Sequence, residues 1–501
     1  DPRVTKTAML ADVYLPLKPR TDIALINGML HVLMAEGLFN ARYIAEHTNG
    51  FEELRQSVSG WTPARAAEIT GLTSEQIVAA ARLYGNAKAP MLAWTMGVNH
   101  STQGTETVNA LCNLALITGN LGKPGASPFS ITGQCNAMGT REAGFTSGMP
   151  GYRKFDDPAD RAELAALWNI DESELPHKRG YAYPDIIEAV LRREIRALWI
   201  IATNPLVSFP NYELLSDALS RLDMLVVQDG FHPTPTTELA HIVLPAAIWG
   251  EKEGTYTNSE RRVSKANRAV DPPGEALPDF DIFLRVGREL GVTDRLFAGW
   301  TGPKDAFEEW RRVSKGRLCD YSGITYSRLE AEGPMQWPCG EGDSAETSRL
   351  YEDGRFEYAD GRAKLWPVEW HPFPEQPDGE YPLVLNTGRT VEHWHTRTKT
   401  GQVPLLERMS PRAWLEMNPT DAQRLGLRPH DKVTVRSRRG AVDKVELRVT
   451  SIVAPGQVFM PFHFSEWNSN RLTQSAYDPI SREPNFKQCS VAVERTAEAK
   501  R

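Results

Sequence analysis

The segment from Met96 to Gly144 contains the side chains best suited to binding a large polar ligand. Two long stretches rich in Gly, Asn, Gln, Thr and Pro flank a short predicted helix. Ordering each loop residue costs about 1–2 kcal/mol of backbone entropy, and long loops inside a compact domain are usually functional or disordered. Because these loops carry His100, Met138 and Arg141 between well-patterned elements, we expect them to form the walls of a binding site.

A second group of polar side chains directly follows two predicted strands. Asn204 comes after the apolar run 197–202, and Gln228 and Asp229 come after the run 224–227. Ligands of open α/β sheets bind beyond the carboxyl ends of the strands, so we expect these side chains to hydrogen-bond a ligand. The alternative is ordinary turn chemistry, because Asn-Pro and Asp-Gly are common turn dipeptides.

The elements that must position these groups are predicted from hydrophobic periodicity. Apolar runs at 197–202, 224–227 and 241–244 alternate with helical patterns at 185–191 and 212–222. Such alternation indicates a parallel sheet that is covered on both faces.

The two ends of the chain differ in pattern. Near the N-terminus, start signals at Thr21, Thr62 and Thr73 precede amphipathic helical runs. Near the C-terminus the pattern is β, and its short runs predict a small barrel or sandwich. These runs lie at 381–385, 432–436, 443–450 and 457–461.

Composition limits the class of protein. The chain has 501 residues, enough for about two to four domains. Its net charge of −7 argues against a nucleic-acid-binding surface, and no apolar run approaches the roughly 18 residues of a membrane span. The five cysteines are widely spaced without a CxxC pair, so we expect reduced thiols in a cytoplasmic protein rather than disulfides or a metal cluster built by this chain.

Six motifs stand out along the chain: MGVNHSTQGTETVNA (96–110), TGQCNAMGTREAG (132–144), ATNPLVSFPN (202–211), HPTPTTELAHIVLPAAIWGEKEGTYTNSERR (232–262), TGRTVEHWHTRT (387–398) and VFMPFHFSEWNSNRL (458–472). In their order and spacing, these motifs resemble the molybdopterin oxidoreductases of the dimethyl-sulfoxide-reductase family. Within that family, the motifs most resemble the assimilatory nitrate reductases.

The resemblance implies an α/β fold with two Rossmann-like parallel-sheet domains and a C-terminal β-barrel of the double-psi type. Residues 1–135 and 136–335 would each form an α/β dinucleotide-binding domain. Residues 336–378 would form a linker, and residues 379–501 would form the dinucleotide-binding barrel.

The resemblance also implies a cofactor, molybdenum bis(molybdopterin guanine dinucleotide), and the residues that bind it. The first segments to match are Asp1, Pro2, Arg3, Thr5, Arg20, Thr21, Asp22, Met96 and His100. The middle of the chain contributes Asn204, Gln228, Asp229, Lys252 and Asp279. The barrel contributes Thr387, Gly388, Arg389, Glu392, His393, Trp394, His395, Thr396, Phe462, Asn470 and Lys487. The Asp22 carboxylate is suited to accept both edge N–H groups of guanine.

Several of these positions have alternative interpretations. The HWH triplet at 393–395 has one interpretation as a histidine-ligated metal site. The alternatives are contact with the pterin and simple packing. Without the resemblance, Phe462 would be assigned to the core and Lys487 to the solvated surface.

The implied reaction is reduction of nitrate to nitrite by oxygen-atom transfer. Nitrate is a planar anion that suits an arginine fork better than a lysine point charge, so we assign Arg141 to substrate binding. Met138 matches the family position that shapes access to the metal. The alternatives are that Arg141 pairs with Glu142 or a pterin phosphate and that Met138 fills a packing gap.

The family's cysteine-rich start is not found in this sequence, which begins at Asp1. We therefore expect an N-terminally truncated fragment, inactive alone. The 4Fe-4S cluster, the protein ligand of molybdenum and any export signal would lie upstream of Asp1.

Alternative functions are a formate dehydrogenase or a periplasmic nitrate reductase of the same family. A third alternative, from another functional class, is a metal-free scaffold subunit with the pterin-binding fold. For the nitrate reductase, the electron donor would be a ferredoxin, a flavodoxin or a nicotinamide-dependent reductase subunit.

Overall fold

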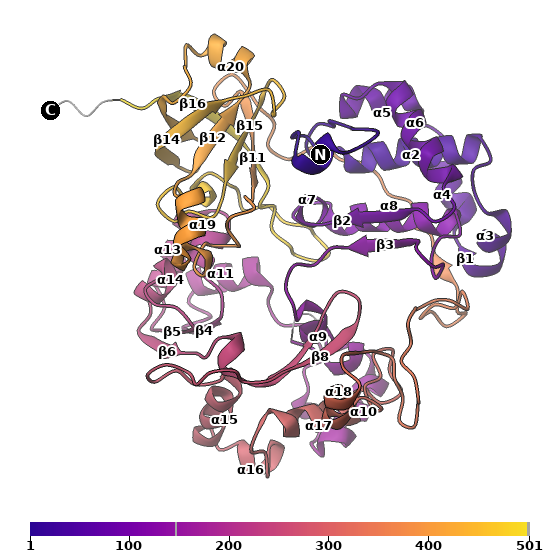
Figure 1. The fold of residues 1–501 in the computed structure, drawn as a ribbon, viewed down its shortest axis with the longest axis vertical. Coiled ribbons are helices and arrows are strands. Elements are labelled where there is room, and N and C mark those ends of the chain that lie inside the picture. Colours follow the sequence, from indigo (N-terminus) through magenta and orange to yellow (C-terminus); the bar gives the residue numbers. More distant parts are fainter. Residues whose placement is uncertain (146–147, 498–501) are drawn as a thin grey trace.

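The structure is a computed structural model that describes residues 1–145 and 148–497. The elements form four groups: an N-terminal helical group, a parallel sheet, a small antiparallel sheet with its helices, and a barrel (Figure 1). Within the described ranges, no helix combines the length and apolar character that crossing a membrane requires.

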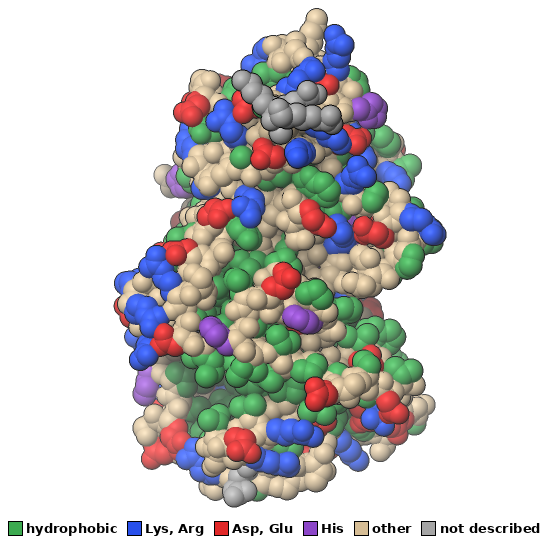
Figure 2. All heavy atoms as spheres, turned by 90° about the vertical axis from the view of Figure 1, so that its left-hand side faces the viewer, with side chains coloured by type: hydrophobic (Ala, Val, Ile, Leu, Met, Phe, Trp, Pro, Cys, Tyr) green, Lys and Arg blue, Asp and Glu red, His purple; other side chains and the backbone are tan. Residues whose placement is uncertain are grey.

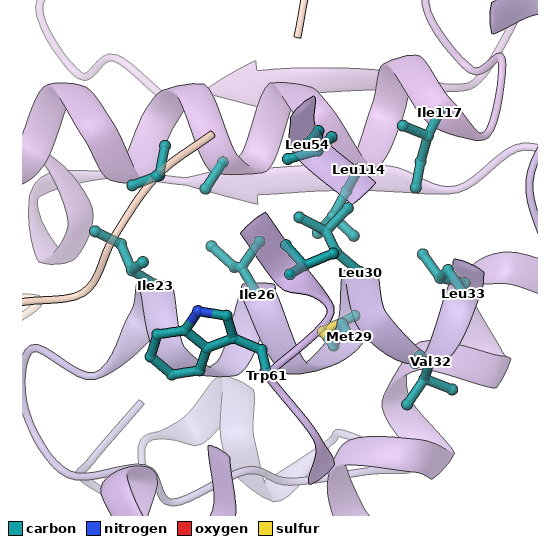
Figure 3. Close-up of a cluster of buried hydrophobic side chains, with 14 of the residues drawn as sticks. Ile23, Ile26, Met29, Leu30, Val32, Leu33, Leu54, Trp61, Leu114 and Ile117 are labelled. Atoms are coloured by element: carbon teal, nitrogen blue, oxygen red, sulfur yellow. The ribbon is translucent and has the colours of Figure 1, made fainter. Parts of the chain in front are cut away.

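The N-terminal group packs around one central helix, α2 (Asp22–Ala35). Leu30 and Leu33 of α2 are fully buried in the cluster that Figure 3 shows, together with Trp61. The surrounding helices are α3 (Ala41–His47), α4 (Phe51–Val58), α5 (Pro63–Thr70), α6 (Ser74–Asn86) and α8 (Gly104–Ile117). Gly28 lets α2 approach α5 closely, because a Cβ at this position would lie 2.8 Å from the Ala66 Cβ.

Two of the three predicted helix starts are confirmed as side-chain caps. The Thr62 hydroxyl accepts from the Arg65 N–H, and Thr73 forms a capping box with Gln76. Thr21 precedes α2 but makes no such bond. Its hydroxyl instead donates to the Lys18 carbonyl oxygen at 2.7 Å, which ties down the chain that enters the helix.

The predicted parallel sheets are confirmed. Strands β4 (Ala197–Ile201), β5 (Met224–Asp229) and β6 (Ile242–Pro245) are all parallel and lie in this order. Helices α11 (Tyr183–Leu191) and α13 (Tyr212–Ser220) cover one face. On the other, Trp199 contacts Phe283 of α15 (Asp279–Glu289). In the N-terminal group, β2 (Met91–Trp94) and β3 (Ser127–Ser130) form a second parallel pair.

The antiparallel sheet was not predicted from the sequence. It contains β7 (Gly254–Thr257), β8 (Arg262–Ala266) and the short β9 (Met335–Gln336). Around it lie α9 (Ala137–Glu142), α10 (Pro158–Trp168), α17 (Pro303–Ser314) and α18 (Tyr326–Ala331). Its buried cluster includes Val263, Phe307, Tyr321 and Trp337, and Met138 packs against it.

The C-terminal group is a closed barrel, which decides between the predicted barrel and sandwich. The strands lie in the order β11-β15-β12-β14-β13-β16, with β11 parallel to β15 and β12 parallel to β14. They are β11 (Leu383–Gly388), β12 (Trp414–Met417), β13 (Lys432–Arg436), β14 (Ala441–Val449), β15 (Gln457–Pro461) and β16 (Gln488–Arg495). Apolar side chains that alternate along these strands, such as Leu385 and Val433, fill its interior.

The segment before the barrel runs back along the N-terminal group. Its strand β10 (Ala363–Lys364) pairs in parallel with β1 (Thr48–Asn49). Leu365 and Val368 are buried in the N-terminal core. This path carries the chain from the antiparallel sheet across the helices to the barrel.

The face in Figure 2 mixes positive and negative side chains over its upper and lower parts, with apolar side chains between them.

Candidate functional site

A cavity of about 460 Å³ brings together residues from the N-terminal group, the parallel sheet and the barrel. The first wall is α7 (Met96–Asn99) with its neighbours, the second is the loop after β4, and the third is formed by barrel loops. Nine of the predicted cofactor-binding residues line it: Asp1, Met96, His100, Thr387, Arg389, His395, Phe462, Asn470 and Lys487.

Two further cavities, of about 290 and 580 Å³, continue from the first. The middle cavity shares Gln134, Thr203, Ser208 and His395 with the first. It shares Asn204, Phe231, Thr396 and Thr398 with the third. Asn204 and Asp229 therefore line cavities at the carboxyl ends of β4 and β5, where the sheet topology places ligands. Trp394 and Thr396 lie in the opposite wall.

Two cationic side chains, Arg389 and Lys487, line the first cavity. Lys487 donates to the Thr387 carbonyl oxygen at 3.2 Å, and burial, together with the nearby Arg389, lowers the pKa of Lys487 to about 8. Burial also lowers the pKa of Arg389. These groups are poorly hydrated, so an anionic ligand would stabilise their charged forms.

Two histidines of this cavity are held by protein contacts. His100 lies 3.2 Å from the Glu483 carboxylate and packs on the Phe486 ring, and burial is the main cause of its lowered pKa. Burial and the neighbouring Arg389 lower the pKa of His395 to about 4. His395 is therefore neutral at pH 7, with its Nε2 3.2 Å from Gln134 Nε2.

His393 lies outside these cavities. It is buried, with Nε2 2.7 Å from the Ser410 carbonyl oxygen and Nδ1 3.1 Å from the Thr400 hydroxyl. Both ring nitrogens therefore have protein partners, which favours packing over metal binding at this position. Across the described part of the chain, no three His, Cys, Asp or Glu side chains are arranged to hold a metal ion. Gly388 and Glu392 also do not line the three cavities.

The predicted N-terminal residues divide between several places. Arg3 forms a two-point ion pair with Glu416 of β12, at 2.6 and 2.7 Å, and Thr5 caps the short α1 (Lys6–Met9). Pro2, like these two, lies outside the three cavities. Arg20 and Thr21 line a separate cavity of about 380 Å³ beside the linker.

Asp22 begins α2, next to these two residues, and desolvation raises the pKa of its carboxyl group.

Gln228, Lys252 and Asp279 form a cluster beside the end of β5. The Asp279 carboxylate accepts from Gln228 Nε2 at 2.6 Å and pairs with the Lys252 ammonium. The buried Gln228 Oε1 has no hydrogen-bond partner among the described residues. This unsatisfied acceptor could bind a donor of a ligand.

The two residues predicted to be catalytic lie on α9. This helix begins three residues after Gln134, which lines the first two cavities. Met138 is half-buried against the cluster of the antiparallel sheet, and Arg141 is exposed at the end of the helix. Neither lines the three cavities.

Some lining residues were not predicted. Gln134 and Thr203 lie inside motifs that were recognised, so their positions were within reach of sequence reasoning. Glu483 and Phe486 come from an irregular loop before β16 that has no periodic pattern.

The donor set fits the pterin dinucleotides that the sequence resemblance implies. Their phosphates need positive charge, which Arg389 and Lys487 provide, and their ring edges need donors and acceptors such as Asn204 and Asp229, whereas Gln228 is fully buried and does not line the three cavities. The three adjoining cavities give a long compartment rather than a single compact one.

Two family models match the chain. The model described as "Molybdopterin oxidoreductase" matches residues 1–289, more than half of the chain. The model described as "Molydopterin dinucleotide binding domain" matches residues 383–490, which contain most of the barrel.

Similar proteins include a nitrate reductase from Synechocystis, 41% identical over 98% of this chain and 70% of its own length. The F420-dependent formate dehydrogenase subunit alpha of Methanocaldococcus jannaschii is 40% identical, over 99% of this chain and 71% of that protein. The assimilatory nitrate reductase catalytic subunit of Bacillus subtilis is 36% identical, over 98% of this chain and 69% of that protein.

Among solved structures, acetylene hydratase from Pelobacter acetylenicus superposes with a TM-score of 0.77 at 19% identity. The match covers 99% of this chain and 73% of that one, and at this identity it supports the fold alone. The family models and the relatives place this chain in the molybdopterin oxidoreductase family, as an oxidoreductase whose cofactor is molybdenum bis(molybdopterin guanine dinucleotide).

Proposed function

We propose that this protein reduces nitrate to nitrite in nitrate assimilation. Overall identity does not separate nitrate reductases from formate dehydrogenases, since the values are 41% and 40%. The segment 133–144 is the observation that favours a nitrate reductase over a formate dehydrogenase. Its sequence GQCNAMGTREAG resembles the nitrate reductases, whereas formate enzymes of the family typically show an Asn-Val-Gln-Gly type of sequence there.

In this proposal Arg389 and Lys487 hold anionic groups of the cofactor in the first cavity. Asn204 and Asp229 hydrogen-bond the cofactor in the middle cavity. The bound cofactor supplies two-electron oxygen-atom transfer chemistry. In the overall reaction, nitrate takes up two electrons and two protons to give nitrite and water.

The role proposed for α9 is substrate binding. The Arg141 guanidinium is exposed and can donate two parallel N–H groups to a planar anion. The Met138 side chain, one helical turn earlier, would narrow the access of larger anions. Glu142 does not neutralise Arg141, because its own carboxylate is buried and engaged elsewhere.

We further propose that electrons arrive through a 4Fe-4S cluster from a ferredoxin, a flavodoxin or a nicotinamide-dependent reductase subunit. All five cysteines are unpaired in the described ranges, in keeping with the reducing cytoplasm that we propose for the enzyme.

The test compares two reactions of the purified holoenzyme. We expect reduced viologen to drive nitrite formation from nitrate, and formate not to reduce oxidised viologen. Formate oxidation without nitrate reduction would establish the second candidate, a formate dehydrogenase, the activity named for a relative that is 40% identical. Absence of molybdenum and guanine nucleotide from the protein would instead indicate a scaffold subunit.

A further inference from the structure

The short helix α9 is attached at one end to the antiparallel sheet and at the other to the buried cluster beneath that sheet. Before its first turn, the Asn136 side-chain oxygen accepts the backbone N–H of Thr257, the last residue of β7, at 2.9 Å. At its other end, Glu142 points into the cluster beneath the sheet, where its side chain is fully buried. Thr257 takes part in both attachments, through its backbone and through its hydroxyl.

The Glu142 carboxylate has two buried donors. Oε1 accepts from Trp337 Nε1 at 2.6 Å, and Oε2 accepts from the Tyr321 hydroxyl. The Tyr321 hydroxyl also lies 2.5 Å from the Thr257 hydroxyl. Tyr321 and Trp337 are each only 2% exposed, so water does not replace these contacts.

A buried carboxylate is costly to maintain, even when it is hydrogen-bonded. Burial raises the pKa of Glu142 to about 7, although the bonds from Tyr321 and Trp337 act in the opposite direction. The costly buried carboxyl group of Glu142 therefore lies next to Arg141 in the sequence. The Glu142 side chain is buried in the cluster, whereas the Arg141 side chain is exposed to solvent.

We propose that Glu142 is a positioning residue: held by Tyr321 and Trp337, it fixes the end of α9 and thereby the direction in which Arg141 meets the anionic substrate. This rests on the proposed function, in which Arg141 binds nitrate. The inference concerns a residue that does not itself touch the substrate.

The contacts allow glutamine to replace Glu142. Trp337 can only donate, so the group at 142 must offer it an acceptor. A glutamine can accept from Trp337 with its oxygen and donate to the Tyr321 oxygen with its NH₂, while Tyr321 donates to Thr257. A leucine offers neither bond and leaves the Trp337 and Tyr321 groups buried without a partner.

The first experiment measures nitrate reduction by holoenzyme variants. Tyr321→Phe and Glu142→Leu should raise the KM for nitrate about tenfold, with a smaller change in kcat and unchanged molybdenum content. Glu142→Gln should restore the KM to within about threefold of the wild-type value.

The matched control is Tyr326→Phe. Tyr326 belongs to the same buried cluster, but its hydroxyl has no hydrogen-bond partner in the part of the chain that the structure describes. Its removal should leave the KM for nitrate unchanged. An equal rise in KM for Tyr326→Phe and Tyr321→Phe would mean that general loosening of the cluster is responsible, and would overturn the proposal.

A double-mutant cycle separates this inference from the function on which it rests. If Glu142 acts through Arg141, Tyr321→Phe should add no further loss of kcat/KM in an Arg141→Ala background. Additive losses would overturn the positioning role while leaving Arg141 in place. An Arg141→Ala enzyme with full nitrate-reducing activity would overturn both the binding role of Arg141 and this inference, whereas a wild-type holoenzyme that does not reduce nitrate would contradict the proposed function itself.

Discussion

His463, on the barrel side of the cavities, is kept neutral mainly by its burial, and its two hydrogen-bond contacts suit the neutral ring. Its side chain is fully buried, Nδ1 lies 2.6 Å from the His395 carbonyl oxygen, and Nε2 lies 2.8 Å from the Thr390 backbone nitrogen. A neutral ring that donates from Nδ1 and accepts at Nε2 satisfies both contacts. A protonated ring would place a second N–H against that of Thr390. Burial is the main cause of a His463 pKa of about 4.

This buried histidine makes stability depend on pH. The unfolded chain binds the proton near pH 6.5 and the folded chain only near 4, so the free energy of unfolding falls as the pH drops through this window. For this group we expect a slope of up to about 1.4 kcal/mol per pH unit, and no effect above pH 7. Urea denaturation at several pH values measures it, and His463→Gln should make the slope shallower. An unchanged slope in that variant would contradict the assignment.

The role of Arg141 can be tested separately from cofactor binding. Arg141→Ala should lower kcat/KM for nitrate by roughly 30-fold or more, because a charged donor pair is typically worth more than about 2 kcal/mol. Molybdenum content should stay normal, since Arg141 does not line the three cavities. Arg141→Lys, which keeps the charge but not the fork, should recover only part of the loss. Wild-type turnover by the alanine variant would remove Arg141 from the mechanism.

At the scale of elements, the close contact between α2 and α5 depends on Gly28. A Cβ there would lie 2.8 Å from Ala66 and 3.3 Å from the Ile77 side chain. Gly28→Ala gains about 1 kcal/mol of helix propensity but must separate packed helices, which typically costs about 1–3 kcal/mol.

We therefore expect Gly28→Ala to lower the thermal unfolding temperature. Gly180→Ala is the matched control, because a Cβ at 180 would meet no described atom within 4 Å. Equal unfolding temperatures for the two variants would show that α2 can move away from α5 without loss.

Strongly patterned elements could be predicted from the sequence, and weakly patterned ones could not. The continuous apolar runs that became β4 and β5 and the alternating runs that became barrel strands are patterns that stand out from their neighbours. The strands β8 and β9 do not, since they are short, mixed in polarity and separated by the helices α15 to α18. The Thr21 hydroxyl donates to the Lys18 carbonyl oxygen instead of accepting from the first turn of α2. Local rules for helix starts do not include this competing hydrogen bond.

The candidate site was predictable where a motif marks it. Lys487 and Phe462 were assigned to the cofactor only through the family resemblance, because a lysine usually indicates surface and a phenylalanine usually indicates core. The burial of Glu142 could not be predicted, since its hydroxyl partner lies 179 residues away. Contacts of this kind depend on the folded arrangement of loops rather than on a local pattern.

At the scale of the whole molecule, the ion pair between Arg3 and Glu416 joins the first residues of the chain to the barrel. Glu416 is 4% exposed, and Arg3 also lies over the Phe459 ring, 4.4 Å from its centroid. A backbone hydrogen bond from Val4 to Ile452 lies beside this pair. Removing one partner of a buried pair leaves the other charge without compensation.

Arg3→Ala should therefore reduce the free energy of unfolding, but by less than the roughly 3–5 kcal/mol typical of a fully buried pair, because the Arg3 side chain is 25% exposed and Glu416 also accepts from Trp414 Nε1 at 3.2 Å. Arg42→Ala serves as the control, because the Arg42 side chain is 85% exposed and its pair with Glu46 is solvated. Calorimetry of the two variants should show a large fall in unfolding temperature for the first and almost none for the second. A small effect of Arg3→Ala would mean that the barrel and the N-terminal residues are joined mainly by other contacts.

The first cavity takes its walls from Asp1 and from Lys487, almost the full length of the chain apart. During translation the N-terminal wall leaves the ribosome long before the last one exists. A nascent chain thus has no closed compartment for a dinucleotide, and capture of the cofactor must follow the synthesis of the barrel. Translation that stops short of β16 would leave the barrel open, because β16 pairs with both β11 and β13, and the barrel wall of the first cavity would then lack its support.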